Sequence, residues 1–130
     1  MGAQSHVVEG KVRRAELLLC WRRHDEACDL ASTVLDEIPK DSSTLMQRAA
    51  LNRILGYCSA ADGDLERVEE ELRASLELAT QADAEFEVAL TLEALARILR
   101  DHPQANEWND GQASRLAHLD VIATPVVPIG

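Results

Sequence analysis

Apolar residues recur every three or four positions along most of the chain, which is the spacing of one face of an α-helix. The clearest example lies in residues 55–79, where one apolar run ends at the turn Gly63-Asp64. The stripe that follows this turn consists of Leu65, Val68, Leu72, Leu76 and Ala79. Two helices joined by so short a turn must lie antiparallel and in contact. The pattern therefore predicts a helical hairpin at the centre of the chain.

The same periodicity predicts six helices, at about 9–23, 26–38, 44–61, 64–81, 84–101 and 104–118. The first break falls at His24-Asp25, and Pro39 stops the second helix. Thr44 and Gln47 have the spacing of a capping box, and Asp83 can cap the fifth helix. The fold class is therefore predicted to be all-α.

The inward stripes of these helices form the predicted core. Leu17, Cys20 and Trp21 widen the apolar face of the first helix, which predicts that this helix is covered on more than one side. The third helix is apolar nearly all round and should be central. The predicted core residues are Val12, Ala15, Leu18, Leu19, Ala27, Leu30, Ala31, Val34, Leu35, Ile38, Leu45, Met46, Ala49, Leu51, Ile54, Leu55, Cys58, Leu65, Val68, Leu72, Leu76, Ala79, Phe86, Ala89, Leu92, Leu95, Ala96, Leu99, Trp108, Leu116 and Leu119.

The two ends of the chain differ from the middle. Residues 1–8 are expected to be a flexible start, and residues 9–120 form the helical domain. The tail 121–130 holds two prolines and several β-branched apolar residues, so it is predicted to be extended. Free exposure of these apolar groups is unfavourable, and we expect the tail to dock on the last hairpin of its own or a neighbouring chain.

Positions in the helices repeat along the chain. Small residues recur near the middle of the first helix of each pair, and a second position recurs early in each second helix. The first set is Ala15, Gly56 and Ala96, and the second is Ala27, Val68 and Trp108; both are spaced by 41 and 40 residues. Periods of this length are typical of stacked helical hairpins. We therefore expect three antiparallel hairpins stacked in a row.

The central hairpin resembles the tetratricopeptide repeat family. The matching residues are Leu55-Gly56, the turn Gly63-Asp64, and the helix start Leu65-Glu66-Arg67; Arg22 stands where the family usually has the turn glycine. The long period and the ending EVALTLEALARIL…RLAHLDVIATPVVPI look like the C-terminal regions of bacterial nucleotide cyclases, signalling ATPases and large transcription activators. The resemblance implies a short solenoid that serves as a regulatory, protein-binding part of such a protein.

The resemblance also implies where a partner would bind. In that family the first helix of each hairpin lines a concave groove. On this sequence the groove positions are Glu16, Leu19, Arg53, Tyr57, Glu93, Arg97 and Arg100. The three arginines would offer donors to a carboxylate, and the tyrosine a flat apolar surface. A surface of charged helix residues without any ligand is the alternative.

Composition and charge narrow the function. The 130 residues carry a formal net charge of −10, and residues 62–93 hold eleven acids and two bases. A nucleic-acid partner is disfavoured because phosphates would be repelled. The acidic surface is either simply solvated or a docking face for a basic partner. No apolar stretch reaches membrane-spanning length and no signal layout opens the chain, so we expect a cytoplasmic protein that does not bind membranes.

The sequence offers little for catalysis or metal binding. Cys20, His24 and Cys28 could share a face and bind zinc on an unbroken helix, but a turn is predicted between them and no fourth ligand is evident. We expect buried thiols, no metal and no cofactor. Known catalytic motifs are absent, so we expect no enzyme. A protein- or peptide-binding module is the first hypothesis; self-association as a homodimer and small-ligand sensing are the alternatives.

Overall fold

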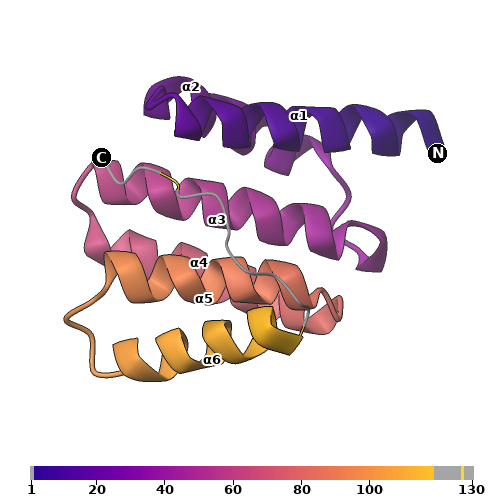
Figure 1. Ribbon diagram of the computed structural model, residues 1–130. Coiled ribbons are helices and arrows are strands. Elements are labelled where there is room, and N and C mark those ends of the chain that lie inside the picture. Colours follow the sequence, from indigo (N-terminus) through magenta and orange to yellow (C-terminus); the bar gives the residue numbers. More distant parts are fainter. Residues whose placement is uncertain (1, 119–126, 128–130) are drawn as a thin grey trace.

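The computed structural model describes residues 2–118 and residue 127, and within these residues all regular structure is helical (Figure 1). The elements are α1 (Gly2–Cys20), α2 (His24–Glu37), the short 3-10 helix η1 (Ser42–Thr44), α3 (Leu45–Ala61), α4 (Leu65–Gln81), α5 (Glu85–Ile98) and α6 (Ala105–His118). The prediction of an all-α fold is confirmed. The predicted tail 121–130 and Leu119 lie outside the described residues, apart from Val127.

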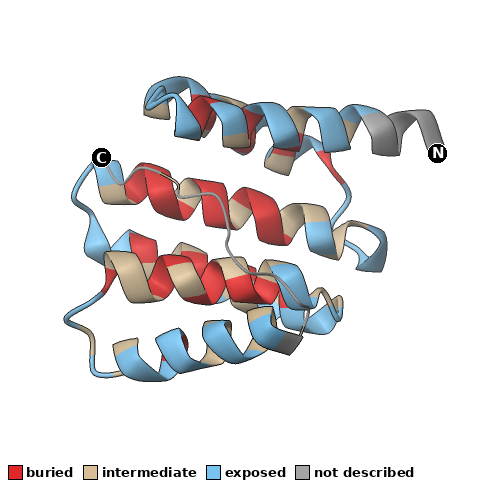
Figure 2. Ribbon diagram, viewed as in Figure 1, coloured by how far each residue is buried: buried red, intermediate tan, exposed pale blue. Residues whose placement is uncertain are grey.

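Consecutive helices pack against each other from α1 through to α6. In addition, α3 contacts both α1 and α5. Within the described residues, α4 makes no corresponding backbone contact with α2 or α6. The helix α3 thus lies in the middle of the layers, and buried residues follow it along most of its length (Figure 2). The prediction that this apolar helix is central is confirmed, since neighbours cover it on several sides.

Three turns end in the same way. Arg22, Gly63 and Asp83 have positive φ values of 60°, 77° and 55°. In each turn the residue after the positive φ donates its N–H to a carbonyl five positions earlier, as in Arg23 to Leu18 at 2.8 Å. This is the Schellman motif, which satisfies the last carbonyls of a helix and reverses the chain. Only one of the three positions is a glycine, and the other two side chains adopt a conformation that costs some energy.

Several local predictions are wrong. The helix α1 begins at Gly2, seven residues before the predicted start, and the first break lies at residues 21–23 instead of His24-Asp25. The side chain of Thr44 does not cap α3; its hydroxyl donates to the carbonyl of Pro39 at 2.5 Å. Asp83 does not cap α5, because it is the left-handed residue of the preceding turn.

Most of the predicted core is buried in one cluster, but three predicted core residues are exposed. Met46, Leu65 and Phe86 lie in the first turn of their helices, where fewer neighbours can cover a side chain. The residues that were predicted to widen the apolar face of the first helix, Leu17, Cys20 and Trp21, are exposed as well. No described element packs on their side of α1, so the prediction that this helix is covered on more than one side is wrong.

The repeat positions lie at the contacts between helices. Ala15, Ala27, Val68 and Trp108 are buried, and Ala96 is partly buried. A Cβ added to the buried Gly56 would lie 2.6 Å from Cδ2 of Leu72, so the missing side chain is what allows α3 and α4 to approach. No helix among the described residues is long and apolar enough to cross a membrane.

Candidate functional site

A buried arginine joins the three helices α1, α3 and α5. The side chain of Arg53 is only 4% exposed; its Nη2 lies 3.3 Å from Oε2 of Glu16, and its Nε lies 2.8 Å from Oε1 of Glu87. Burial alone would lower the pKa of Arg53, but the carboxylates of Glu87 and Glu16 outweigh it and hold the pKa above its ordinary value. Arg53 is therefore charged and is held by carboxylates on both sides.

This arrangement changes the expected role of Arg53. The sequence predicted that its guanidinium would offer donors to the carboxylate of a partner. In the structure these donors already serve Glu16 and Glu87 inside the domain. Arg53 consequently holds α1, α3 and α5 together, and a ligand could reach it only by displacing a buried ion pair.

The buried Tyr57 lies beside this ion pair and close to the next charged pair on α5. Burial, followed by the charge of Glu93, raises the pKa of its phenol to about 12, although the guanidinium groups of Arg53 and Arg97 act in the opposite direction. Tyr57 is only 1% exposed, so it presents no flat surface to a partner. It links the Arg53 cluster to the residues that do reach the surface.

Arg97 of α5 makes two polar contacts, one with its own helix and one with the main chain near the C-terminus. Its Nη1 lies 3.1 Å from Oε1 of Glu93, and its Nη2 donates a 2.7 Å hydrogen bond to the main-chain carbonyl of Val127. The side chain of Val127 is partly buried and packs against the hydrophobic core. Arg97 thus already binds a peptide group from a distant part of the chain, and that group comes with an apolar side chain that the domain partly covers.

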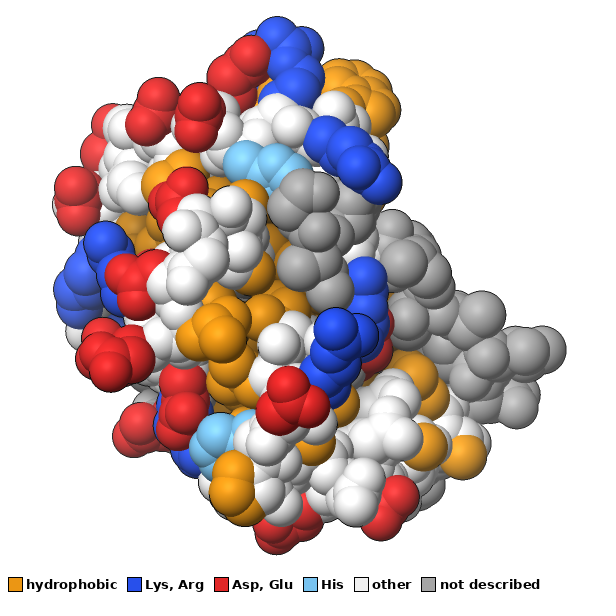
Figure 3. All heavy atoms as spheres, turned by 90° about the vertical axis from the view of Figure 1, so that its left-hand side faces the viewer, with side chains coloured by type: hydrophobic (Ala, Val, Ile, Leu, Met, Phe, Trp, Pro, Cys, Tyr) orange, Lys and Arg blue, Asp and Glu red, His pale blue; other side chains and the backbone are white. Residues whose placement is uncertain are grey.

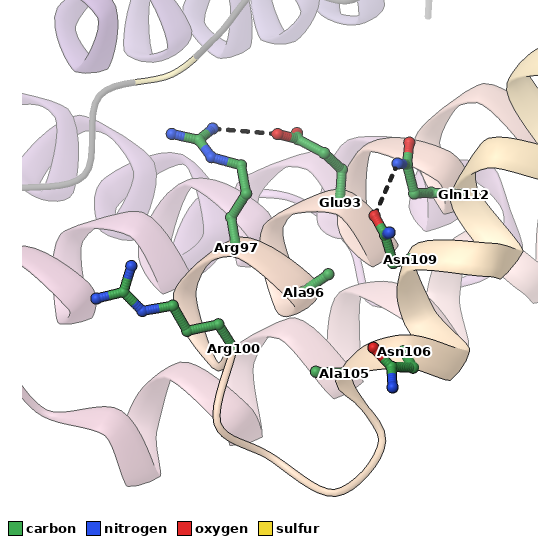
Figure 4. Close-up of a pocket in the computed structure, with 8 residues that line it drawn as sticks. All are labelled: Glu93, Ala96, Arg97, Arg100, Ala105, Asn106, Asn109 and Gln112. Atoms are coloured by element: carbon green, nitrogen blue, oxygen red, sulfur yellow. Dashed lines mark hydrogen bonds and ion pairs between the residues drawn. The ribbon is translucent and has the colours of Figure 1, made fainter.

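A cleft of about 470 Å³ adjoins Arg97, between α5 and α6 (Figure 4). Arg97 and Arg100 project on one side of it, and amide side chains of α6 lie on the other. Between them Ala96 and Ala105 are small enough to leave room (Figure 4). The remaining residues that line the cleft are Glu93, Asn106, Asn109 and Gln112, of which Asn109 accepts a 3.3 Å hydrogen bond from Gln112.

The seven predicted groove residues therefore separate into two groups. Glu16, Arg53 and Tyr57 form the polar interior between α1, α3 and α5, and Leu19 is fully buried in the hydrophobic core. Glu93, Arg97 and Arg100 line the open cleft. All lie on α1, α3 or α5 or directly after α5, but only the last three are placed to meet a partner.

Sequence reasoning missed Glu87 and the amides Asn106, Asn109 and Gln112. The amides are spaced by three residues, which places them along one face of α6, and this spacing could have indicated a polar surface. No comparable signal marks Glu87. It is one of many acidic residues in the region 62–93, and only the packing of α3 against α5 brings it to Arg53.

A second polar cluster joins α4 to the loop before α6. Arg73 donates to Glu69 at 2.9 Å and to Gln104 at 2.6 Å, and its Cζ lies 5.6 Å from the ring centroid of Trp108. The ring of His102 lies 4.6 Å from that of Trp108. These contacts use the polar groups within the domain, so the cluster serves to position α6 beside the cleft.

The cysteines are not arranged as a metal site. All three are free: Cys20 is exposed, and the pKa of the Cys58 thiol is strongly raised by burial and by the neighbouring Cys28. The Sγ of Cys58 lies 3.7 Å from the carbonyl oxygen of His24, which holds α3 to the start of α2. Within the described residues, no group of three or more potential ligands is gathered that could hold a metal ion.

Comparisons with models of protein families, with curated proteins and with solved structures find no match for this chain.

Proposed function

We propose that this domain is a non-catalytic protein-interaction module that binds a short extended peptide segment at the cleft between α5 and α6. The one observation that carries the proposal is the hydrogen bond from Arg97 to the carbonyl of Val127, together with the partial burial of the Val127 side chain. A surface that holds one main-chain carbonyl and one apolar side chain of its own chain can hold the same groups of another.

The chemistry of the cleft suits a peptide. Amide side chains both donate and accept hydrogen bonds, so Asn106, Asn109 and Gln112 can pair with main-chain N–H and C=O groups alike. Arg100 is exposed at the rim and supplies a positive charge suited to a carboxylate. These features favour a polar, extended ligand over a purely apolar one.

The resemblance to tetratricopeptide repeats supports the same reading. It would make the six helices three stacked hairpins, with α1, α3 and α5 as the first helices that contact one another in sequence. It would also make the chain the regulatory C-terminal part of a larger bacterial signalling protein. Self-association and small-ligand sensing have no specific observation in their favour at this cleft.

A binding measurement with the full chain tests the proposal. The probe is a fluorescently labelled peptide with the sequence of residues 121–130, and the readout is its anisotropy. The variant Val127→Asp weakens the contact of residue 127 with the core, because a charged side chain cannot pack there. It therefore frees the guanidinium of Arg97 and should bind the probe more tightly than the parent. Adding Arg97→Gln should then lower the affinity about tenfold or more, since a hydrogen bond to a charged donor contributes roughly 1.5–3 kcal/mol.

Arg67→Gln is the matched control, because Arg67 is an exposed arginine on α4 outside the residues that line the cleft. It should leave the affinity for the probe unchanged. Equal binding by the Val127→Asp protein with and without Arg97→Gln would refute the proposed site. No binding to any variant would refute the proposal as a whole.

A further inference from the structure

One face of α1 is exposed along its length. Val7, Gly10, Arg14, Leu17 and Trp21 are spaced by three or four residues, so they lie along a single stripe, and all five are exposed. Leu17 is 50% exposed and Trp21, just after the helix, is 63% exposed. Figure 2 shows exposed residues along the side of α1 that faces away from α3. This α1 stripe carries three large apolar groups without a described neighbour to cover them.

The equivalent stripes of α3 and α5 are covered over most of their length. The repeat spacing of 41 residues makes Cys58 of α3 the equivalent of Leu17. The summed spacing of 81 residues makes Thr91 of α5 the equivalent of Gly10. Cys58 is buried, and its Sγ lies 3.7 Å from a carbonyl at the start of α2. Thr91 is fully buried, and its hydroxyl lies 2.9 Å from that of Ser75 on α4.

These contacts show what kind of element such a stripe receives. In both cases it is the preceding helix of the chain, which lays its apolar face on the stripe. Most further equivalents are covered too. Leu51 and Leu95 are fully buried at the positions of Gly10 and Arg14, and Leu55 and Ile98 are partly buried, whereas Asp62 at the position of Trp21 is exposed. The α1 stripe is therefore equivalent in position to surfaces that bind a helix on α3 and α5, and no described helix covers it.

Charge indicates the chemistry of the missing helix. Arg14 lies within the α1 stripe and has no ion-pair partner among the described residues. Arg13 beside it is paired with Glu9 and Glu16, and Lys11 is paired with Glu37 of α2. Figure 3 shows basic, acidic and hydrophobic side chains side by side at the end of the molecule where α1 meets α2. A partner helix would therefore gain from acidic residues at the edges of its apolar face.

We propose that the α1 stripe is a docking surface for an acidic amphipathic α-helix from another polypeptide segment, separate from the cleft at Arg97. A second copy of the chain fits less well. If two α1 stripes packed against each other about a two-fold axis through the middle of the stripe, Arg14 of one copy would face Arg14 of the other, and like charges at an interface are unfavourable.

The probe is an acetylated, fluorescently labelled peptide with the sequence of α4, residues 65–81. It holds five glutamates and two arginines and no aromatic residue, and α4 is itself a helix that packs on the equivalent stripe of α5. We expect the full-length protein to raise the anisotropy of this peptide, and the bound peptide to protect Trp21 from iodide quenching. Leu17→Asp should weaken binding about tenfold or more, and Arg14→Glu should weaken it several-fold and reduce its dependence on salt.

Phe86→Asp is the matched control, because Phe86 is another exposed large apolar residue but lies at the start of α5. It should bind the peptide as the parent does. Circular dichroism should show that all variants stay folded, which is expected because the mutated side chains are exposed. Absence of binding, or binding that Leu17→Asp leaves unchanged, would overturn the proposal; the second result would mean that the peptide replaces α4 instead. A protein that is dimeric in solution and becomes monomeric with Leu17→Asp would show that the occupant is a second copy, which also overturns it.

Discussion

Replacing Arg53 by methionine should destabilise the domain more than most single substitutions. Methionine is unbranched like the stem of arginine and fills a similar volume, so the change removes the charge and the hydrogen bonds while much of the packing volume is kept. What it leaves behind are the carboxylates of Glu87 and Glu16, whose side chains are 13% and 27% exposed. Both would lose their positive partner in a poorly solvated place.

The size of the effect follows from this burial. Removing one partner of a buried ion pair costs roughly 3–5 kcal/mol, because the remaining charge is uncompensated. The partial exposure of Glu16 lowers this cost, so we expect Arg53→Met to reduce the free energy of unfolding by about 3 kcal/mol. A domain is commonly stable by only about 5–15 kcal/mol, so the loss is a large part of the whole.

Urea denaturation followed by circular dichroism measures the loss. With a slope of about 1–3 kcal/mol per molar urea, the midpoint should fall by about 1–3 M. The decisive control is the triple variant Arg53→Met, Glu16→Gln, Glu87→Gln, which removes the unpaired charges. It should recover at least half of the lost stability, since neutral amides are easier to bury than carboxylates.

Two results would refute the reasoning. A midpoint for Arg53→Met equal to that of the parent would mean that Arg53 is not a buried ion-pair partner. A triple variant as unstable as the single variant would mean that lost packing, and not unpaired charge, is the cause.

Three further predictions concern single residues. Gly56→Leu should lower stability by about 1–3 kcal/mol, because the buried Leu72 occupies the space of the new side chain, whereas Gly56→Ala should cost less since alanine favours the helix by about 1 kcal/mol; equal melting of parent and Gly56→Leu would contradict this. Tyr57 is the single tyrosine, so ultraviolet titration of the folded protein should show its ionisation at a pKa of about 12. This pKa is raised above the unfolded value of about 10, so the contribution of Tyr57 to stability is lost as the pH rises through this range. Ionisation at about pH 10 in the folded protein would contradict the burial of Tyr57. Iodide should quench the exposed Trp21 and spare the buried Trp108, so Trp21→Phe should remove most of the quenching; quenching that survives in this variant would contradict the burial of Trp108.

The local chemistry of the sequence was enough to predict most of the helices. Periodic apolar positions, the Gly63-Asp64 turn and Pro39 act on residues close in the chain, and for that reason their effect can be read without the fold. The same holds for the contact at Gly56, where a residue without a side chain in an apolar helix indicates close approach of a neighbour. The predictions at Thr44 and Asp83 were wrong because each residue had a second local role. The Thr44 hydroxyl donates to the carbonyl of Pro39, and Asp83 takes the left-handed position of a turn.

The candidate site shows where sequence reasoning ended. The spacing of 40 and 41 residues brought Glu16, Tyr57 and Arg97 into one line on successive first helices. It could not show that Arg53 is neutralised by Glu87 within the domain, or that Arg97 holds Val127. These pairs are 34 and 30 residues apart in the chain, and nothing in the periodicity of either helix relates them.

By itself the sequence determined the fold class, most helix positions and the composition of the core, because these depend on hydrophobic periodicity and turn chemistry within each helix. The tertiary structure alone decided which charged residues are buried and which remain free to meet a partner. Exposure depends on what neighbouring elements cover. Leu17 and Leu18 each belong to a row of apolar positions spaced by three or four residues, yet Leu18 is buried whereas Leu17 and Trp21 are exposed. An apolar residue on a helix is only a candidate for burial, and the packing of other helices against it settles the outcome.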